Sequence, residues 1–199
     1  SREMRDLLGG KGANVAEMTR LGLPVPQGFT ITTATCLEYL KGDHRFPAGL
    51  DEEVSHHLAT LEAAAGTKLG HPDNPLLVSV RSGAKFSMPG MMDTVLNLGL
   101  NDESVEGLAA KTGNGRFAYD SYRRFIQMFA DVVSEVEKHH FERALSELKR
   151  LRGVANDVEL GESDLRGLVD TYKGIYRTHK GEAFPQMPRE QLNCAIRAV

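Results

Sequence analysis

A lysine flanked by glycines is the clearest candidate for chemistry near the start of the chain. Residues 8–14 read Leu-Gly-Gly-Lys-Gly-Ala-Asn, which places Lys11 just before a predicted helix. Glycines let backbone N–H groups approach an anion, a helix N-terminus adds partial positive charge, and the lysine adds a full one. The segment therefore predicts a phosphate-binding loop, although a flexible loop with a solvated lysine fits the same residues.

This glycine-rich segment differs from the best-known phosphate-binding motifs. Arg5 stands where a P-loop has its first glycine, and Gly12 replaces the serine or threonine that ends a P-loop. Val15 occupies the place of the last glycine of a dinucleotide-binding fingerprint. The segment is therefore a phosphate-binding candidate outside both motifs.

Arg81 is the second candidate, because it follows a short apolar run. Leu76–Val80 predicts a buried strand that delivers Arg81 and small residues into the loop over Gly83–Gly90. The planar fork of an arginine side chain can bind phosphate oxygens through two parallel hydrogen bonds. The alternative is an arginine paired with a carboxylate, and the residues alone leave both open.

Three of the seven methionines lie within five residues of the same loop region, at positions 88, 91 and 92. Flexible, polarizable methionine side chains suit the wall of a pocket for a flat ligand such as a nucleobase. Ordinary packing is the alternative interpretation of this cluster.

Other residues that could carry chemistry are less informative. The neighbouring members of His56-His57 and of His139-His140 point in different directions on a helix, so neither pair alone makes a metal site. Cys36 and Cys194 are too few for a disulfide framework. No spacing of serine, cysteine, histidine or aspartate singles out a catalytic nucleophile.

The first hundred residues mix helix and strand patterns that would position Lys11 and Arg81. The expected elements are a helix over Asn14–Leu21, a strand over Phe29–Thr32, a helix capped by Thr33 and running to about Lys41, a helix over Val54–Ala65, and strands over Leu76–Val80 and Thr94–Leu98.

From Asn101 onwards the strand patterns disappear and apolar residues recur every three or four positions. The expected helices are one capped by Asn101 and running to Lys111, then Ala118–Val133, Phe141–Leu151, one capped by Ser163 and ended by Gly181, and a last one from about Arg189. We therefore expect an incomplete α/β subdomain over 1–100, a helical subdomain over 101–180, and a segment over 181–199 that returns to the α/β part.

Composition bounds the class of protein. The 199 residues are 41% hydrophobic and 26% charged, with a net charge of −3, which excludes wholesale disorder and gives no basic face for nucleic acid. No apolar run reaches the roughly 20 residues of a membrane span, and no signal peptide is recognisable, so we expect a cytoplasmic protein without a membrane partner. The chain starts at Ser1 and stops within a helical pattern, so we expect a fragment of a longer protein.

Several long segments together resemble one family of enzymes. The segments Leu7–Met18, Gly22–Phe29, Ser79–Gly99 and Arg116–Phe129 are similar to the N-terminal part of pyruvate phosphate dikinases. The related phosphoenolpyruvate synthases share the lysine and arginine signatures, but they have a second serine and an acidic stretch where this chain has Gly83–Phe86. The resemblance therefore favours the dikinase family.

This resemblance implies an α+β fold: the first part of an ATP-grasp-type nucleotide-binding domain, a mixed sheet with flanking helices, plus an inserted helical subdomain. Such a domain binds ATP with Mg²⁺ and passes the β-phosphoryl group to a histidine on another domain of the same chain. The full enzyme interconverts ATP, phosphate and pyruvate with AMP, pyrophosphate and phosphoenolpyruvate, generally as a homodimer. By resemblance, Lys11 and Arg81 bind the ATP phosphates and Met92 lines the nucleotide pocket.

The resemblance also implies what this chain lacks. The metal-binding carboxylates and the glycine-rich lid of the family belong to positions after Val199, as do the phosphohistidine domain and the pyruvate-binding barrel. We therefore expect no catalytic residue and no metal ligand here, and no dikinase activity from these residues alone. The alternatives are a dikinase like phosphoenolpyruvate synthase, and a non-catalytic module whose helical segment docks a partner.

Overall fold

The computed structural model describes residues 4–83 and 94–199. These residues form two compact units, each discontinuous in sequence. Unit 1 holds residues up to 66 together with 81–83, and unit 2 holds 67–80 together with 94–199. Met92 and most of the predicted loop over Gly83–Gly90 lie outside the described residues.

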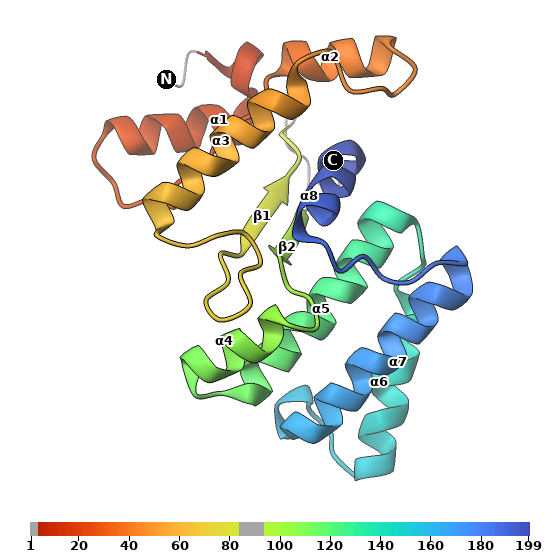
Figure 1. The fold of residues 1–199 in the computed structure, drawn as a ribbon. Coiled ribbons are helices and arrows are strands. Elements are labelled where there is room, and N and C mark those ends of the chain that lie inside the picture. The colour runs from red at the N-terminus through yellow and green to blue at the C-terminus, as the bar shows by residue number, and fades with distance from the viewer. Residues whose placement is uncertain (1–3, 84–93) are drawn as a thin grey trace. The chain divides into compact units, whose positions relative to one another are not determined.

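Unit 1 is built from three helices, drawn in red and orange in Figure 1. They are α1 (Arg5–Arg20), α2 (Thr33–Lys41) and α3 (Leu50–Ala65). Helix α3 has three acidic residues in its first turn, where their negative charge interacts favourably with the positive end of the helix dipole. It buries Leu50, Val54 and Leu58 along one face and ends at Gly66 in the left-handed conformation.

Three predictions for unit 1 are wrong: the start of the first helix, the strand over Phe29–Thr32 and the cap of the second helix. Helix α1 starts at Arg5 rather than at Asn14, because only Gly9 leaves the helical conformation (φ 68°, ψ 171°) and the other glycines continue the helix. Residues 8–14 therefore form no loop. They belong to α1, which is interrupted at Gly9 alone. Phe29–Thr32 forms no strand, since no neighbouring strand of unit 1 pairs with it. Its last residue, Thr32, instead accepts a hydrogen bond from the Thr35 N–H and caps α2, one residue before the predicted cap Thr33.

The sheet has two strands, β1 (Val78–Arg81) and β2 (Thr94–Leu98), and all of their residues except Arg81 belong to unit 2. The prediction of β2 is confirmed, and Val95 and Leu98 on it are fully buried. Strand β1 starts two residues after the predicted Leu76 and ends one residue after the predicted Val80. It is also only half-buried, because its single sheet neighbour among the described residues is β2.

The rest of unit 2 is helical, as the apolar periodicity predicts. The side chain of Asn101 accepts a hydrogen bond from the Ser104 N–H at 2.7 Å and so starts the first of these helices. Gly161, and not Ser163, precedes the fourth helix, while Gly181 ends it as predicted. The elements are α4 (Ser104–Thr112), α5 (Gly115–Ser134), α6 (His139–Arg152), a 3₁₀ turn η2 (Asp157–Glu159), α7 (Glu162–Lys180) and α8 (Pro188–Ala198).

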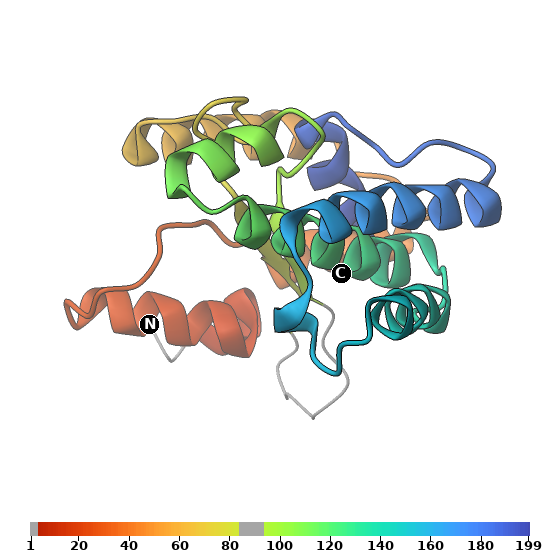
Figure 2. The ribbon, with the colours of Figure 1, turned by 90° about the horizontal axis from the view of Figure 1, so that it is seen from below.

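Helix α5 lies at the centre of unit 2, in contact with α4, α7, α8 and β2 (Figures 1 and 2). Its aromatic side chains meet Phe184, whose ring contacts those of Phe125, Phe129 and Tyr176 edge to face at centroid distances of 5.3–5.7 Å. Aromatic pairs of this geometry add to the stabilisation that comes from burial alone. Phe125 and Phe129 of α5 therefore belong to the core of unit 2.

The whole is helix-rich with a small two-stranded sheet, which agrees with the α+β class. Within residues 4–83 and 94–199, each helix is too short or too polar to cross a lipid bilayer.

Candidate functional site

The structure brings together the two segments that carry the predicted phosphate-binding cations. A methyl group on Gly9 would lie 2.5 Å from the carbonyl oxygen of Gly83 and 3.4 Å from its Cα atom. The backbone after β1 therefore passes directly against the break in α1. Lys11 follows Gly9 by two residues and Arg81 precedes Gly83 by two, so each cation is attached close to this contact.

Lys11 lies in the first turn of α1 after the break. Gly10, Lys11 and Gly12 form this turn, and the first N–H groups of a helix have no carbonyl partner within it. The side chain of Lys11 is half-buried and makes no ion pair or side-chain hydrogen bond with another described residue. A lysine in the first turn of a helix segment is an arrangement that attracts anions.

Arg81 is the last residue of β1, and its side chain is exposed. It makes no ion pair with a carboxylate in the described part of the chain, so the pairing that the sequence left open is not observed there. The third predicted site residue, Met92, lies outside the described residues. Unit 1 thus presents two cations near one backbone contact.

The structure also reveals residues that the sequence reasoning missed. A methyl group on Gly12 would lie 3.1 Å from Cγ2 of Thr30, and the hydroxyl of Thr33 donates to the carbonyl oxygen of Asp6 at 2.5 Å. Residues 30–33 therefore contact α1 on both sides of its break. The only signal in the sequence was the run of threonines, which predicted a strand.

The described residues do not fit a resident Mg²⁺ ion. No group of three or more histidine, cysteine, aspartate or glutamate side chains among them is arranged to hold a metal. Magnesium in nucleotide sites usually takes carboxylate ligands together with phosphate oxygens. No step of the proposed chemistry is therefore assigned to a metal held by the described residues.

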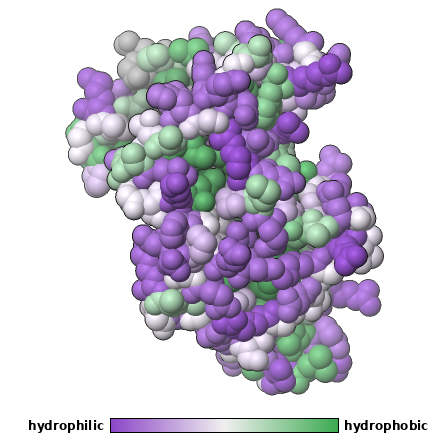
Figure 3. Space-filling view, in the orientation of Figure 1, coloured by the Kyte–Doolittle hydropathy of each residue, from purple (hydrophilic) through white to green (hydrophobic). Residues whose placement is uncertain are grey.

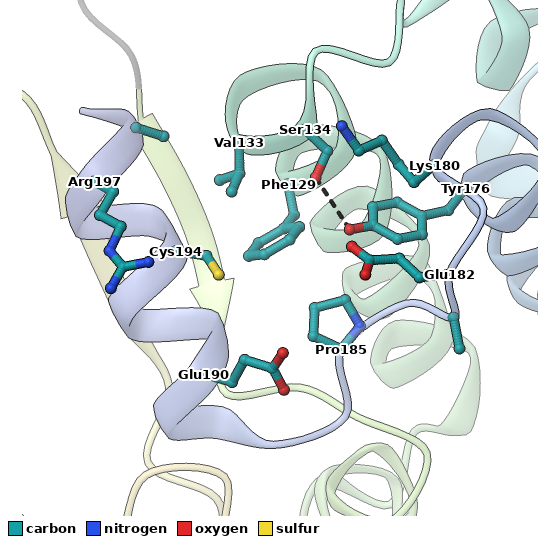
Figure 4. A pocket seen from close by; sticks show the side chains of 12 residues that line it. Phe129, Val133, Ser134, Tyr176, Lys180, Glu182, Pro185, Glu190, Cys194 and Arg197 are labelled. Carbon is teal, nitrogen blue, oxygen red and sulfur yellow. Dashed lines mark hydrogen bonds between the residues drawn. The ribbon is translucent and has the colours of Figure 1, made fainter. Parts of the chain in front are cut away.

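A separate pocket of about 360 Å³ lies in unit 2, between α5, α7 and α8 (Figure 4). Cations and carboxylates line it together, and the hydroxyls of Ser134 and Tyr176 are hydrogen-bonded to each other at 3.1 Å. Burial raises the pKa of the Cys194 thiol, which keeps it protonated and a poor nucleophile near neutral pH. Neither Lys11 nor Arg81 lines this pocket, and it shows no preference for one ligand charge.

Comparison with known proteins connects this geometry to a family. Residues 5–44, which include Lys11 and the break at Gly9, match the family model described as the AMP/ATP-binding domain of pyruvate phosphate dikinase. The match supports the resemblance inferred from the sequence.

Similarity to individual proteins extends over the whole chain. The chain is 54% identical over 98% of its length to pyruvate, phosphate dikinase of Clostridium symbiosum and 55% identical over its full length to the chloroplastic protein of Mesembryanthemum crystallinum. It is 56% identical over 98% of its length to the protein of Giardia intestinalis. These matches confirm the resemblance, and the chain spans about a fifth of the length of these curated relatives.

Proposed function

We propose, from this similarity to pyruvate, phosphate dikinases, that the chain is part of the ATP-binding domain of such an enzyme and that Lys11 and Arg81 hold the ATP phosphates. The single observation that carries the assignment of the site is the contact between Gly9 and Gly83, which brings the two cation-bearing segments together. The family model that covers the Lys11 segment describes an AMP/ATP-binding domain. The three relatives named above are all dikinases, which favours this function over that of phosphoenolpyruvate synthase.

The two cations would neutralise charge on the nucleotide. The N–H groups of the first turn after Gly9 would bind a phosphate oxygen, since the positive end of a helix dipole favours negative charge there. Lys11 adds a point charge beside them, and Arg81 adds a planar donor that can bind two oxygens at once. Such fixed positive groups stabilise phosphates whose charge shifts during phosphoryl transfer. Met92 would pack against the nucleotide.

The finer architecture and the full reaction belong to the same proposal. Unit 1 and β1 would form the start of an ATP-grasp-type domain, and a histidine on another domain of the longer chain would accept the phosphoryl group. That longer chain would interconvert ATP, phosphate and pyruvate with AMP, pyrophosphate and phosphoenolpyruvate in the cytoplasm, as a homodimer, with Mg²⁺ bound by residues other than those described. The residues of this chain bind and orient the nucleotide and transfer no group themselves.

Protection of Lys11 from chemical modification tests the proposal. A non-hydrolysable ATP analogue with Mg²⁺, at ten times its Kd, should slow acetylation of Lys11 about tenfold, because only the free fraction reacts. Lys41, in the last turn of α2, is the control lysine in the same unit and should react at an unchanged rate. Equal rates at Lys11 with and without saturating nucleotide would contradict the assignment.

The alternative of a helical docking module has less support. It requires a large exposed apolar area on the helical part of the chain. On the face that Figure 3 shows, hydrophobic side chains form small areas separated by polar ones.

A further inference from the structure

Residues 30–33, which we call the threonine strap, hold the two halves of α1 at its break. Thr33 bonds the half before Gly9, because its hydroxyl donates to the carbonyl oxygens of Asp6 at 2.5 Å and of Leu7 at 3.3 Å. Thr30 packs on the half after Gly9, where an added methyl on Gly12 would lie 3.1–3.2 Å from its side chain. The threonine strap therefore contacts α1 on both sides of the break at Gly9.

The strap is itself fixed at one end. The side chain of Thr32 caps α2 by accepting a hydrogen bond from the Thr35 N–H at 3.3 Å. Thr33 is therefore the first residue of a capped helix. The bond from Thr33 to the carbonyls of Asp6 and Leu7 therefore ties the start of α2 to the last turn before the break. A single hydroxyl links two elements that are 26–27 residues apart in sequence.

We infer that Thr33 is a positioning residue for the nucleotide site: its hydroxyl holds the short first half of α1. Gly9 then keeps its non-helical conformation against the Gly83 backbone, which fixes where the turn with Lys11 begins. The first half of α1, from Arg5 to Leu8, is a single turn, and one turn of helix is not stable by itself. Without the hydroxyl, that turn loses its bond to α2 and the break gains freedom. This inference rests on the proposed function only in assigning nucleotide to Lys11.

Two variants of Thr33 distinguish the effect of its hydroxyl from the effect of its side-chain shape, and a third variant is the control. Thr33→Val removes the donor and keeps the branched shape, whereas Thr33→Ser restores the donor. Thr60→Val is the matched control, because Thr60 lies on α3 of the same unit and its hydroxyl also donates to a backbone carbonyl, that of His56 at 3.1 Å.

The first readout needs no nucleotide. Amide hydrogen exchange of residues 13–16, whose N–H groups bond carbonyls of the turn that carries Lys11, should become about fivefold faster in Thr33→Val, the factor that one ordinary hydrogen bond gives. Thr33→Ser and Thr60→Val should exchange at the parent rate in this segment. Unchanged exchange in Thr33→Val would overturn the inference whatever the protein binds.

The second readout is the affinity for a non-hydrolysable ATP analogue. Thr33→Val should weaken binding about fivefold in the parent chain but less than twofold when combined with Lys11→Ala, because the hydroxyl acts through the turn that carries Lys11. Equal weakening in both backgrounds would mean a general loss of structure and would overturn the positioning role. If the parent chain binds no nucleotide, the proposed function fails, and hydrogen exchange alone then decides the inference.

Discussion

At Gly9, backbone conformation and close approach coincide. Its φ of 68° with ψ of 171° is a combination that residues with a Cβ atom rarely adopt, and the Gly83 carbonyl oxygen occupies the space that a Cβ would need. Gly22 has a similar φ of 75° but no atom within 4 Å of an added Cβ. Comparing substitutions at the two glycines therefore distinguishes the cost of a positive φ from the cost of the contact with Gly83.

Gly9→Ala should lower the free energy of unfolding by more than about 2 kcal/mol, since it adds a clash with backbone to the strain of a positive φ. Gly22→Ala carries the strain alone and should cost about 1 kcal/mol. Urea unfolding monitored by circular dichroism compares the two variants. Equal losses would show that the backbone of Gly83 moves away freely and that the contact does not constrain the site.

The residue types at the site could be predicted from the sequence, whereas their support could not. A lysine among glycines and an arginine after an apolar run are both residue patterns that suit phosphate binding, and they can be recognised without a structure. The role of Thr33 depends on a bond to carbonyls 26–27 residues away, and carbonyls carry no sequence signature. The location of Met92 relative to these residues stays a prediction.

At the level of elements, periodicity predicted the long helices well and the short segments poorly. Helices α5 and α7 bury an apolar face along their full length, so the repeat of three and four residues is unambiguous. In α1 the glycines suggested a loop, but a helix can continue through glycine at a cost of about 1 kcal/mol per residue. Residues 29–32 are of types that favour strands, but no described strand pairs with them. Whether such a segment forms a strand depends on pairing with a neighbour.

Buried charge also connects elements in unit 2. Arg123 on α5 is only 3% exposed, and its guanidinium contacts Asp120 at 2.7 Å and Asp157 of η2 at 3.0 Å. Burial acts to raise the pKa of Asp157, but the bonds from Lys149 and Arg123 outweigh it and hold that pKa below its ordinary value of 3.8. Asp157 thus stabilises the fold as a carboxylate.

Because the pKa of Asp157 is lowered by folding, its contribution is present above pH 3.8 and is lost as the pH falls through the folded-state value. Asp157→Asn should therefore lower the free energy of unfolding by about 1–2 kcal/mol at pH 7, with the partial exposure of the pair taken into account, and by less at pH 2.5. Thermal unfolding of parent and variant at both pH values measures this difference.

Glu147→Gln is the control for this pH dependence, since Glu147 pairs with Arg150 on the exposed face of α6. That variant should unfold nearly as the parent does at pH 7. A deficit in Asp157→Asn that is as large at pH 2.5 as at pH 7 would show that the carboxylate charge is not what stabilises η2 against α5.

For the molecule as a whole, the two units interleave along the chain. Unit 2 includes residues 67–80 and resumes at 94, while residues 81–83 return to unit 1. Changes in composition along a sequence do not reveal a chain that leaves a unit and comes back to it. The expected boundaries near residues 101 and 181 stay predictions, whereas the resemblance to pyruvate, phosphate dikinases was recognisable from the ordered motifs.

The 199 residues span about a fifth of the length of the curated relatives that they match. The proposal assigns phosphate binding through Lys11 and Arg81 to these residues. The contact between Gly9 and Gly83 is formed within unit 1 alone, so nucleotide binding by the isolated chain is the most direct consequence of the proposal.

Calorimetric titration with a non-hydrolysable ATP analogue and Mg²⁺ tests this claim most directly, with the parent chain, Lys11→Ala, Arg81→Ala and the control Lys41→Ala. We predict binding by the parent, an affinity weaker by about 1–3 kcal/mol in each of the first two variants, the usual size of a lost charge-assisted contact, and no change in Lys41→Ala. An absence of binding by the parent, or equal affinity in all four proteins, would contradict the claim that Lys11 and Arg81 hold the phosphates.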